Sequence, residues 1–396
     1  MTDVHDHSAP PIDPFDPLGL FAEAERQLNI CNSCRYCEGY CAVFPALERR
    51  TVLETGDITH LANLCHDCRA CFQACMYAPP HEFAVNPPEI LARARRASYR
   101  SYVRPLPRII RSLVDRVFPA RLRDHRPLMT SSVLIVAVLL LLVAVSQGVG
   151  SLWRHDGPYR ILAYPALIAV ALVPAAWSVA VILAAAGRYW RGTHGPLRDL
   201  AAPSALGSAL VQAARLSYLR GGGEDCYGDG AAPDPSPARR RWHHAVSYGF
   251  SACFASTVSA SVLQDIMGSP PPYPLLSVPV VLGTAGGVSM IAGCAGLAIL
   301  KQRSGVPQAV SDYSLLIGLG LLAGTGMLTL LLRATPVYGT ALIVHLATIV
   351  VCFGIAPYST FVHGVYRFLA LVQDNLERED LPRKGARAVG VDQQET

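Results

Sequence analysis

The sequence predicts an all-α protein in which a small, cysteine-rich helical domain is followed by a bundle of six transmembrane helices. Three observations favour this fold class. Of the 396 residues, 51% are hydrophobic and only 16% are charged, whereas about 25% are charged in an ordinary soluble domain. Eight of the twelve cysteines lie between residues 31 and 75. The later part of the chain holds long uncharged stretches of about 20 residues, the length that crosses a hydrocarbon core.

Residues 1–17 are polar, acidic and rich in proline, which is typical of a disordered leader. They contain neither a positive n-region nor an apolar h-region, so we expect no secretory signal peptide. The cysteine-rich part should therefore remain on the reducing, cytoplasmic side. Thiols persist there as metal ligands rather than as disulfides.

Residues 18–90 form the predicted cysteine-rich domain, whose segments 18–28 and 57–64 have apolar residues at helical spacing. Residues 91–127 are predicted to be a basic, amphipathic juxtamembrane connector that contacts an anionic lipid bilayer. Its eleven arginines are Arg93, Arg95, Arg96, Arg100, Arg104, Arg108, Arg111, Arg116, Arg121, Arg123 and Arg126. Nucleic-acid binding is an alternative, but a basic run beside a hydrophobic span favours a topology signal, so we expect no nucleic-acid partner.

Six spans are predicted within a membrane domain of residues 128–375. They cover residues 130–149, 161–187, 245–267, 278–300, 313–332 and 337–372. The loop 188–241 carries an amphipathic piece expected at the membrane interface, and residues 376–396 are predicted to be a disordered tail. Basic residues gather in the connector, this loop, residues 301–303 and the tail, so both termini should be cytoplasmic. We expect a multi-pass protein of the bacterial cytoplasmic (inner) membrane.

Two cysteine runs share the spacing C-x2-C-x2-C-x3-C. In bacterial ferredoxins with this spacing, the fourth cysteine of each run ligates the other cluster. We therefore predict two [4Fe–4S] clusters, the first held by Cys31, Cys34, Cys37 and Cys75, and the second by Cys65, Cys68, Cys71 and Cys41. A pair of zinc sites is the alternative, but zinc ligands usually come as C-x2-C pairs separated by a longer gap. Arg35 and Arg69 occupy matching positions, where they could raise the cluster potentials or simply be solvated.

Histidines of the membrane domain are candidates for function because ionisable groups in spans are rare. His345 and His363 lie 18 positions apart on the last predicted span, which is five turns or about 27 Å, so both should face one side. His363, with His243 or His244 at the cytoplasmic start of the third span, is a candidate ligand pair for one b-type haem. His345 has no matching partner between residues 245 and 344, so a second haem is not expected. The alternative is that these histidines only cap helix ends.

Three blocks of sequence suggest a family: CNSCRYCEGYCAVFPALE (31–48), GDITHLANLCHDCRACFQACMYAPPHEFAVNPP (56–88) and RRWHHAVSYGFSACFAST (240–257). On these blocks the chain resembles the tricarballylate (or citrate) utilization protein B family over essentially its whole length. Its membrane half is also similar to the cytochrome b subunits of respiratory nitrate reductase, in span count and histidine placement.

This resemblance implies an accessory to a soluble FAD-containing dehydrogenase that oxidises tricarballylate to cis-aconitate. The accessory would reoxidise the flavin through its two clusters and pass electrons to the membrane quinone pool. Only the eight cysteines are carried over from the family, and no residue indicates where a quinone binds.

Two functions follow as hypotheses. The first is electron transfer from a flavoprotein to quinone, with the substrate chemistry in the partner, because the chain has no dinucleotide-binding glycine loop, P-loop or nucleophile constellation. The second is a membrane transporter or sensor with a redox-sensing iron–sulfur domain. Transport routes usually need polar groups within spans, and four of the predicted spans carry no charge.

Overall fold

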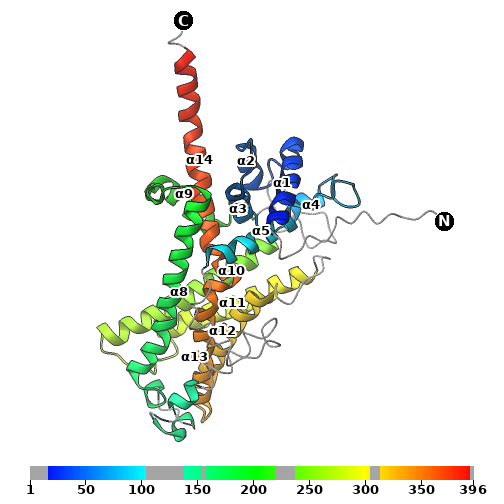
Figure 1. Cartoon of the computed structure of the whole chain (residues 1–396). Helices are drawn as coiled ribbons and strands as arrows, with labels where there is room; N and C mark the ends of the chain where they lie inside the picture. The colour runs from blue at the N-terminus through cyan, green and yellow to red at the C-terminus, as the bar shows by residue number, and fades with distance from the viewer. Residues whose placement is uncertain are drawn as a thin grey trace, which may run out of the picture. The chain divides into compact units, whose positions relative to one another are not determined.

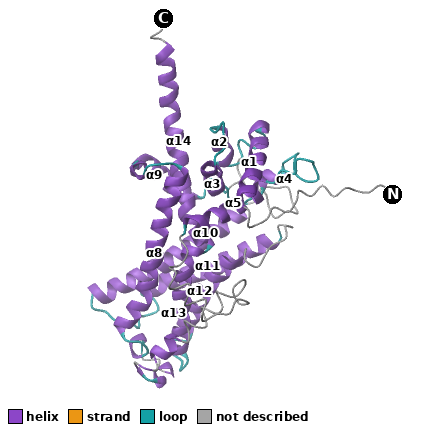
Figure 2. Ribbon diagram, in the orientation of Figure 1, coloured by secondary structure: helices purple, strands orange, loops and turns teal. Residues whose placement is uncertain are grey.

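The computed structural model describes residues 17–103, 138–143, 145, 147–153, 157–219, 237–303 and 313–392. All regular structure among these residues is helical, without a strand (Figure 2). The predicted all-α fold class is therefore confirmed. The chain forms two compact units. Unit 1 comprises residues 1–104, 183–240 and 362–396, and unit 2 comprises residues 105–182 and 241–361.

The N-terminal part of unit 1 is a cluster of short helices (Figure 1). They are α1 (Pro17–Cys34), α2 (Val43–Glu48), α3 (Thr55–Leu64), α4 (Ala70–Gln73) and α5 (Pro87–Tyr102). The start of α3 is capped because the Glu54 backbone N–H donates to the Asp57 carboxylate over 3.0 Å. The start of α5 is capped by Asn86, whose side chain accepts from the Glu89 backbone N–H. Helix α5 packs on α1 and α3, and its Ile90 and Leu91 side chains are buried.

Later segments complete unit 1. They are the end of α8 (Tyr164–Thr193), the short 3-10 helix η4 (Leu197–Ala201), α9 (Pro203–Arg215) and α14 (His363–Asp392). Helix α14 packs against both α9 and α3. Four tyrosine rings from three helices also stack in the interior, with centroids 4.8–6.2 Å apart: Tyr99 and Tyr102 of α5, Tyr189 of α8 and Tyr366 of α14. The cysteine-rich domain is thus built from three separate stretches of the chain.

Two predictions about these segments need correction. Residues 91–102 lie within α5 and pack inside unit 1, so the cysteine-rich unit extends beyond the predicted boundary at residue 90; residues 104–127 of the predicted connector lie outside the described residues. The tail 376–396 is not disordered throughout, because α14 continues to Asp392. In loop 188–241, α9 buries Ala205 and Ala209 and leaves Leu210 of the predicted interfacial face 63% exposed, and its place at the membrane interface stays a prediction.

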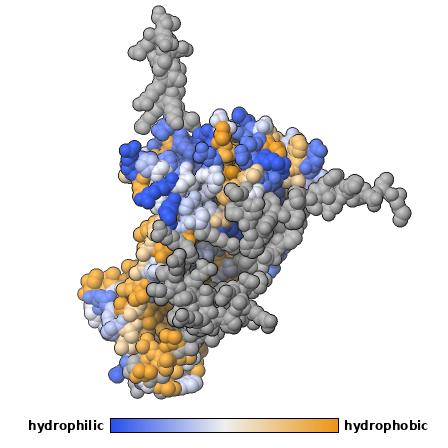
Figure 3. Space-filling model, in the orientation of Figure 1, coloured by the Kyte–Doolittle hydropathy of each residue, from blue (hydrophilic) through white to orange (hydrophobic). Residues whose placement is uncertain are grey.

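Five helices are long and apolar enough to cross a membrane in the described part of the chain. They are α8, α10 (Ala238–Ser261) with its π-helical extension η5 (Val262–Ile266), α11 (Val278–Gln302), α12 (Ser314–Leu331), and α13 (Tyr338–Ile355) with η7 (Ala356–Tyr358). Short 3-10 helices cover Val149–Trp153 (η2) and Pro158–Arg160 (η3). Many large apolar side chains of these spans are exposed, and they form the hydrophobic surface seen in Figure 3. Such a surface needs lipid around it, and the chain is a membrane protein.

The first predicted span, residues 130–149, lies mostly outside the described residues. Residues 138–143 are helical, and Leu139 and Val143 pack with Leu342 and Ile343 of α13 in one apolar core. Five of the six predicted spans therefore coincide with candidate spans of the structure, and a described fragment of the remaining one is helical.

The last predicted span, residues 337–372, is not one helix. Helix α13 ends at Ile355, the 3-10 helices η7 and η8 (Thr360–Val362) follow, and α14 begins at His363. Pro357 lies in η7 and lacks the N–H that would continue the helical ladder. His345 and His363 therefore lie on different helices, and the prediction that they share one face is wrong.

Helices α10 and α11 approach closely along glycines. A Cβ on Gly286 of α11 would lie 2.7 Å from the Gly249 carbonyl oxygen of α10, and one on Gly293 would lie 2.8 Å from the Val246 backbone nitrogen. Gly283 and Gly287 of α11, which form a GxxxG pattern, face different helices. Gly283 faces Ser256 of α10, and Gly287 faces Met327 of α12. Small residues thus set the helix spacing, as in other membrane bundles.

Candidate metal centres

Four cysteines of unit 1 line one cavity. This first cysteine group is Cys31, Cys34, Cys37 and Cys75. Helix α1 delivers the first two, and the turn after it delivers the third, while Cys75 follows α4. Cys34 is exposed and the other three are half-buried. Tyr36 and Met76 line the same cavity and are 59% and 64% exposed, so apolar side chains surround the group where it opens to solvent.

The other four cysteines of the two runs also gather in unit 1. This second cysteine group is Cys41, Cys65, Cys68 and Cys71, whose thiols act electrostatically on one another. Cys65 terminates α3 and is buried. Its Sγ accepts a hydrogen bond from the Asp67 backbone N–H over 3.4 Å. The second group contains no exposed cysteine, unlike the first.

The structure brings the fourth cysteine of each run to the other run, which is the exchange that the ferredoxin spacing predicts. No three His, Cys, Asp or Glu side chains among the described residues converge on a point that would hold a single metal ion. A cubane differs from a single ion because each cysteine ligates a different iron, so its four ligands stand farther apart. The assignment of the eight cysteines as cluster ligands remains a prediction.

The pKa values of the thiols indicate that the two cysteine groups need bound cations. Burial raises the pKa of Cys31 to about 12 and that of Cys37 to about 11, and neighbouring thiols add to both shifts. Burial also raises the pKa of Cys65 to about 11 and that of Cys71 well above its ordinary value. Metals bind the thiolate form. Thiols packed in this way therefore require cations to become ionised, and iron ions fit this donor set.

Arg35 and Arg69 share a backbone feature rather than a charge environment. Each follows the second cysteine of its run, and each has a left-handed backbone, with φ of 55° and 67°. The Arg35 side chain donates to the Asn32 carbonyl over 3.2 Å, and Arg69 faces the Asp67 carboxylate at 3.7 Å. The matching positions thus indicate that both cysteine loops turn in the same way.

Two other arginines lie beside the second cysteine group. Arg95 of α5 donates from Nη1 to the Cys65 carbonyl oxygen over 2.7 Å. Arg367 of α14 donates from Nη1 to the Asn63 carbonyl oxygen over 3.4 Å, and its Nη2 is buried without a hydrogen-bond partner among the described residues. Burial and Arg95 lower the pKa of Arg367 to about 10, and the Cys65 and Cys41 thiols partly offset this. Arg367, which is half-buried with its Nη2 atom buried, therefore remains a cation at neutral pH.

A partly buried cation needs a negative partner, because an unpaired charge in the interior costs several kcal/mol. Neither Arg95 nor Arg367 has a carboxylate within ion-pair distance in the described part of the chain. An iron–sulfur cluster with four thiolate ligands carries net negative charge and would supply the missing partner. The residues around the second group therefore fit an anionic cluster.

The four candidate haem histidines are divided between the units. His243 and His244 lie near the start of α10 in unit 2, and His363 begins α14 in unit 1. The His244 Nε2 atom is buried and has no hydrogen-bond partner among the described residues. His345 is engaged in helix packing, since its Nδ1 lies 3.0 Å from the Thr325 hydroxyl oxygen of α12. The haem ligand pair remains a prediction.

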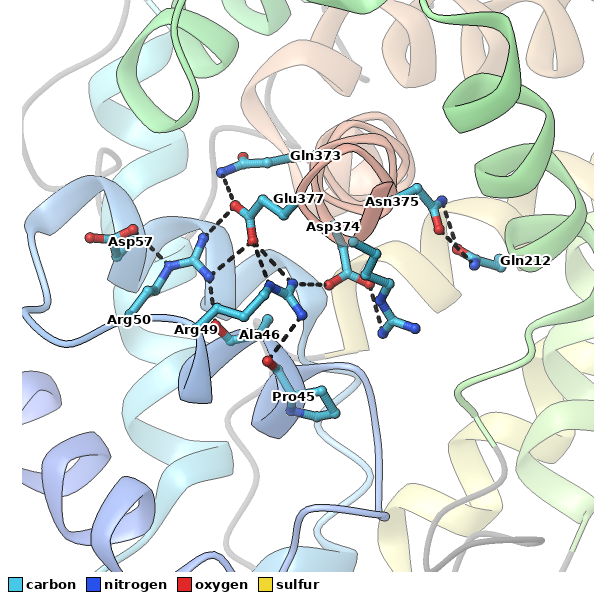
Figure 4. A network of polar contacts seen from close by, with 11 residues as sticks. Pro45, Ala46, Arg49, Arg50, Asp57, Gln212, Gln373, Asp374, Asn375 and Glu377 are labelled. Atoms are coloured by element: carbon cyan, nitrogen blue, oxygen red, sulfur yellow. Dashed lines mark hydrogen bonds and ion pairs between the residues drawn. The ribbon is translucent and has the colours of Figure 1, made fainter. Parts of the chain in front are cut away.

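A polar network ties α14 to the cysteine-rich helices (Figure 4). Arg50 donates to Glu377 of α14 and to Asp57, each over 2.7 Å. Arg49 pairs with Glu377 at 3.0 Å and with fully buried Asp374. Burial opposes ionisation of Glu377, but the surrounding His60, Arg50 and Arg49 outweigh it and lower the Glu377 pKa to about 2. The network holds α14 against α2 and α3.

Sequence reasoning missed Arg95, Arg367 and this network. Arg95 was assigned to the juxtamembrane connector, although Asn86 followed by two prolines is a helix-start signal that could have placed it on a helix. Arg367 falls inside the last predicted span, and an arginine there could have been flagged as a functional candidate. No spacing in the sequence relates Arg49 or Arg50 to Asp374 and Glu377.

The fold and the cysteine groups define a membrane protein with a ferredoxin-like domain. Residues 24–101 match a family model described as the citrate utilization protein B Fer4-like domain, and residues 117–384 match citrate utilization protein B itself. A relative from Escherichia coli, described as citrate utilization protein B, is 37% identical over 386 residues, which is 93% of this chain and 94% of that protein. The chain belongs to the citrate utilization protein B family, which confirms the resemblance. No solved structure matches the chain.

Proposed function

We propose that this chain is a membrane-anchored electron carrier between a partner FAD-containing dehydrogenase and the quinone pool. The observation that carries the proposal is the assembly of eight cysteines into two groups of four within one unit. The name of the Escherichia coli relative points to citrate utilization. The substrate of the partner would accordingly be citrate, tricarballylate or a related tricarboxylic acid.

Each cysteine group would hold one [4Fe–4S] cluster, with thiolates as ligands. When bound, the two clusters supply one-electron redox chemistry, which splits the two electrons of a reduced flavin into single steps. The residues around them have distinct tasks. Exposed Tyr36 and Met76 leave the first group accessible to a soluble partner. The second group contains buried Cys65 and no exposed cysteine, so it is less accessible to water than the first. Helix α14, which carries Arg367 beside this group, begins at His363.

One b-type haem is part of the proposal, with His363 and either His243 or His244 as axial ligands. His363 precedes Arg367 by one helical turn, about 6 Å along the axis. It therefore lies close to the surroundings of the second cysteine group. The buried His244 Nε2, which has no hydrogen-bond partner among the described residues, supports a ligand role for His244.

The location is proposed to be the bacterial inner membrane, with both termini in the cytoplasm. The basic segments on one side of the spans support this orientation. A cytoplasmic position keeps the eight thiols reduced and free to bind iron, and it gives a soluble dehydrogenase access to unit 1.

The test replaces Cys68 by serine in the full-length protein, with Cys253→Ser as the control. Cys253 lies in α10, where its Sγ contacts the Gly283 carbonyl at 3.9 Å, outside both groups. After anaerobic reduction, a soluble quinone analogue should reoxidise the wild type and Cys253→Ser rapidly. Cys68→Ser should lose about half of its iron and most of its reoxidation rate, while it still inserts into membranes.

Two results would count against the proposal. Unchanged iron content in Cys68→Ser would remove Cys68 from the ligands. Full iron and reversible reduction in the wild type, without any reoxidation by quinone, would indicate a redox-sensing domain instead of an electron carrier.

A further inference from the structure

We propose that Arg95 and Arg367 raise the redox potential of the cluster held by the second cysteine group, which makes this cluster the electron acceptor of the pair. The inference rests on the proposed function, because it assumes a [4Fe–4S] cluster in each group. It assigns a role to two residues that neither cysteine run contains, and it gives the electron path a direction from the exposed group to the interior one.

The contacts place both arginines on the same short stretch of chain. Arg95 Nη1 donates to the Cys65 carbonyl oxygen over 2.7 Å, and Arg367 Nη1 donates to the Asn63 carbonyl oxygen over 3.4 Å. Asn63 and Cys65 belong to the end of α3 that delivers the second group's buried cysteine. Two helices far apart in sequence, α5 and α14, therefore bring positive charge to one cluster site.

No carboxylate lies within ion-pair distance of Arg95 or Arg367 among the described residues, and Asp67, which acts on the Cys65 thiol, pairs with Arg69. Like charges repel, so two neighbouring arginines without an acidic partner among the described residues would be unfavourable beside neutral thiols. Arg367 also keeps Nη2 buried and unpartnered. An anionic cluster resolves both problems, because it attracts the two cations and its sulfur atoms can accept the free N–H groups.

The sign of the effect follows from charge. Reduction of a cluster by one electron makes it more negative, and nearby positive charge stabilises the reduced form and raises the potential. Burial acts in the opposite direction by disfavouring added charge, so the two arginines must outweigh the lower exposure of the second group. The first group has no comparable pair of arginines in the described structure: Arg35 of its loop is exposed, whereas Arg69 lies in the loop of the second group and faces Asp67.

The experiment is an anaerobic redox titration of the full-length protein, followed by electron paramagnetic resonance. Cys68→Ser identifies the signal of the second cluster by its loss. Arg367→Gln and Arg95→Gln should each change the reduced-to-oxidised ratio of the second cluster at least tenfold at a fixed potential, a downward shift of about 59 mV. The first cluster should not shift. Arg367→Lys, which retains the charge, should keep most of the wild-type potential.

The matched control is Arg188→Gln. Arg188 also belongs to unit 1 and donates to a backbone carbonyl, that of Tyr102, over 2.6 Å. It should leave both potentials unchanged. Three results would overturn the inference. They are equal shifts in both clusters, no shift of the second cluster in either Arg95→Gln or Arg367→Gln, and an Arg367→Lys potential as low as that of Arg367→Gln. If the Arg367→Gln variant does not fold, the potential of the second cluster in Arg95→Gln decides whether the inference holds. Absence of cluster signals in the wild type would instead contradict the proposed function.

Discussion

His60 shows how a single residue couples the stability of unit 1 to pH. It is fully buried in α3, and neither ring nitrogen has a hydrogen-bond partner among the described residues. Burial lowers its pKa to about 3; Arg50 and Arg49 add to the shift, and Glu377 opposes it. The unfolded chain protonates histidine near pH 6.5. Because the unfolded state binds this proton first, the free energy of unfolding should fall as the pH drops below about 6.5.

Replacing His60 by leucine should remove this pH dependence. The wild type should lose about 1–2 kcal/mol of stability between pH 6.5 and pH 5 through His60, at about 1.4 kcal/mol per pH unit. The His60→Leu variant should be less sensitive over the same range. Thermal unfolding of the full-length protein at several pH values measures the difference.

Glu377→Gln serves as the comparison. The pKa of Glu377 is lowered to about 2, so its contribution is present above about pH 4.5 and is lost only as the pH falls further. This variant should therefore keep the wild-type slope between pH 6.5 and pH 5. Parallel pH profiles for the wild type and His60→Leu would refute the role of His60.

The residues of the candidate site differ in how far the sequence could predict them. The grouping of the eight cysteines follows from spacing, because tight loops bring C-x2-C-x2-C thiols together and leave the fourth for another cluster. Arg367 could not be connected with Cys65 in this way, since some 300 residues separate them and only the packing of α14 joins them. The spacing of residues in the sequence predicts local geometry, whereas tertiary contacts between distant segments leave no periodic pattern in the sequence.

Among the secondary structure elements, long uncharged helices were predictable because hydrocarbon thickness fixes their length. The break between α13 and α14 was not predictable, because the apolar character of residues 337–372 suggests a single span. Pro357 was the available signal. Proline can kink a membrane helix as well as end it, so sequence alone did not decide between these outcomes.

The contact between α10 and α11 gives a prediction for an element. Gly286→Ala should destabilise the protein by about 1–3 kcal/mol, because the new Cβ would meet the Gly249 carbonyl oxygen at 2.7 Å and the backbone cannot yield without separating the helices. Gly324→Ala in α12 is the matched control, since nothing lies within 4 Å of its Cβ position. Thermal unfolding in detergent checks both variants, and equal melting temperatures would contradict the packing argument.

Over the whole molecule, unit 1 is assembled from three stretches of chain rather than from one N-terminal domain. The ion pairs of Arg49 and Arg50 with Asp374 and Glu377 hold the third stretch in place. The sequence suggested a linear order of domains because its composition changes abruptly near the first span. Amino-acid composition gives no information about ion pairs between distant segments. The consequence is that the proposed cluster environment depends on α14 and on Arg367.

The measurement that tests the central claim most directly is the metal content of the purified full-length chain. Iron, zinc and acid-labile sulfide should be assayed together with the anaerobic, dithionite-reduced paramagnetic resonance spectrum. Two [4Fe–4S] clusters predict about eight iron and eight sulfide per chain, with signals from two distinct clusters. Zinc in place of iron, or iron without labile sulfide, would contradict the claim that the two cysteine groups hold iron–sulfur clusters.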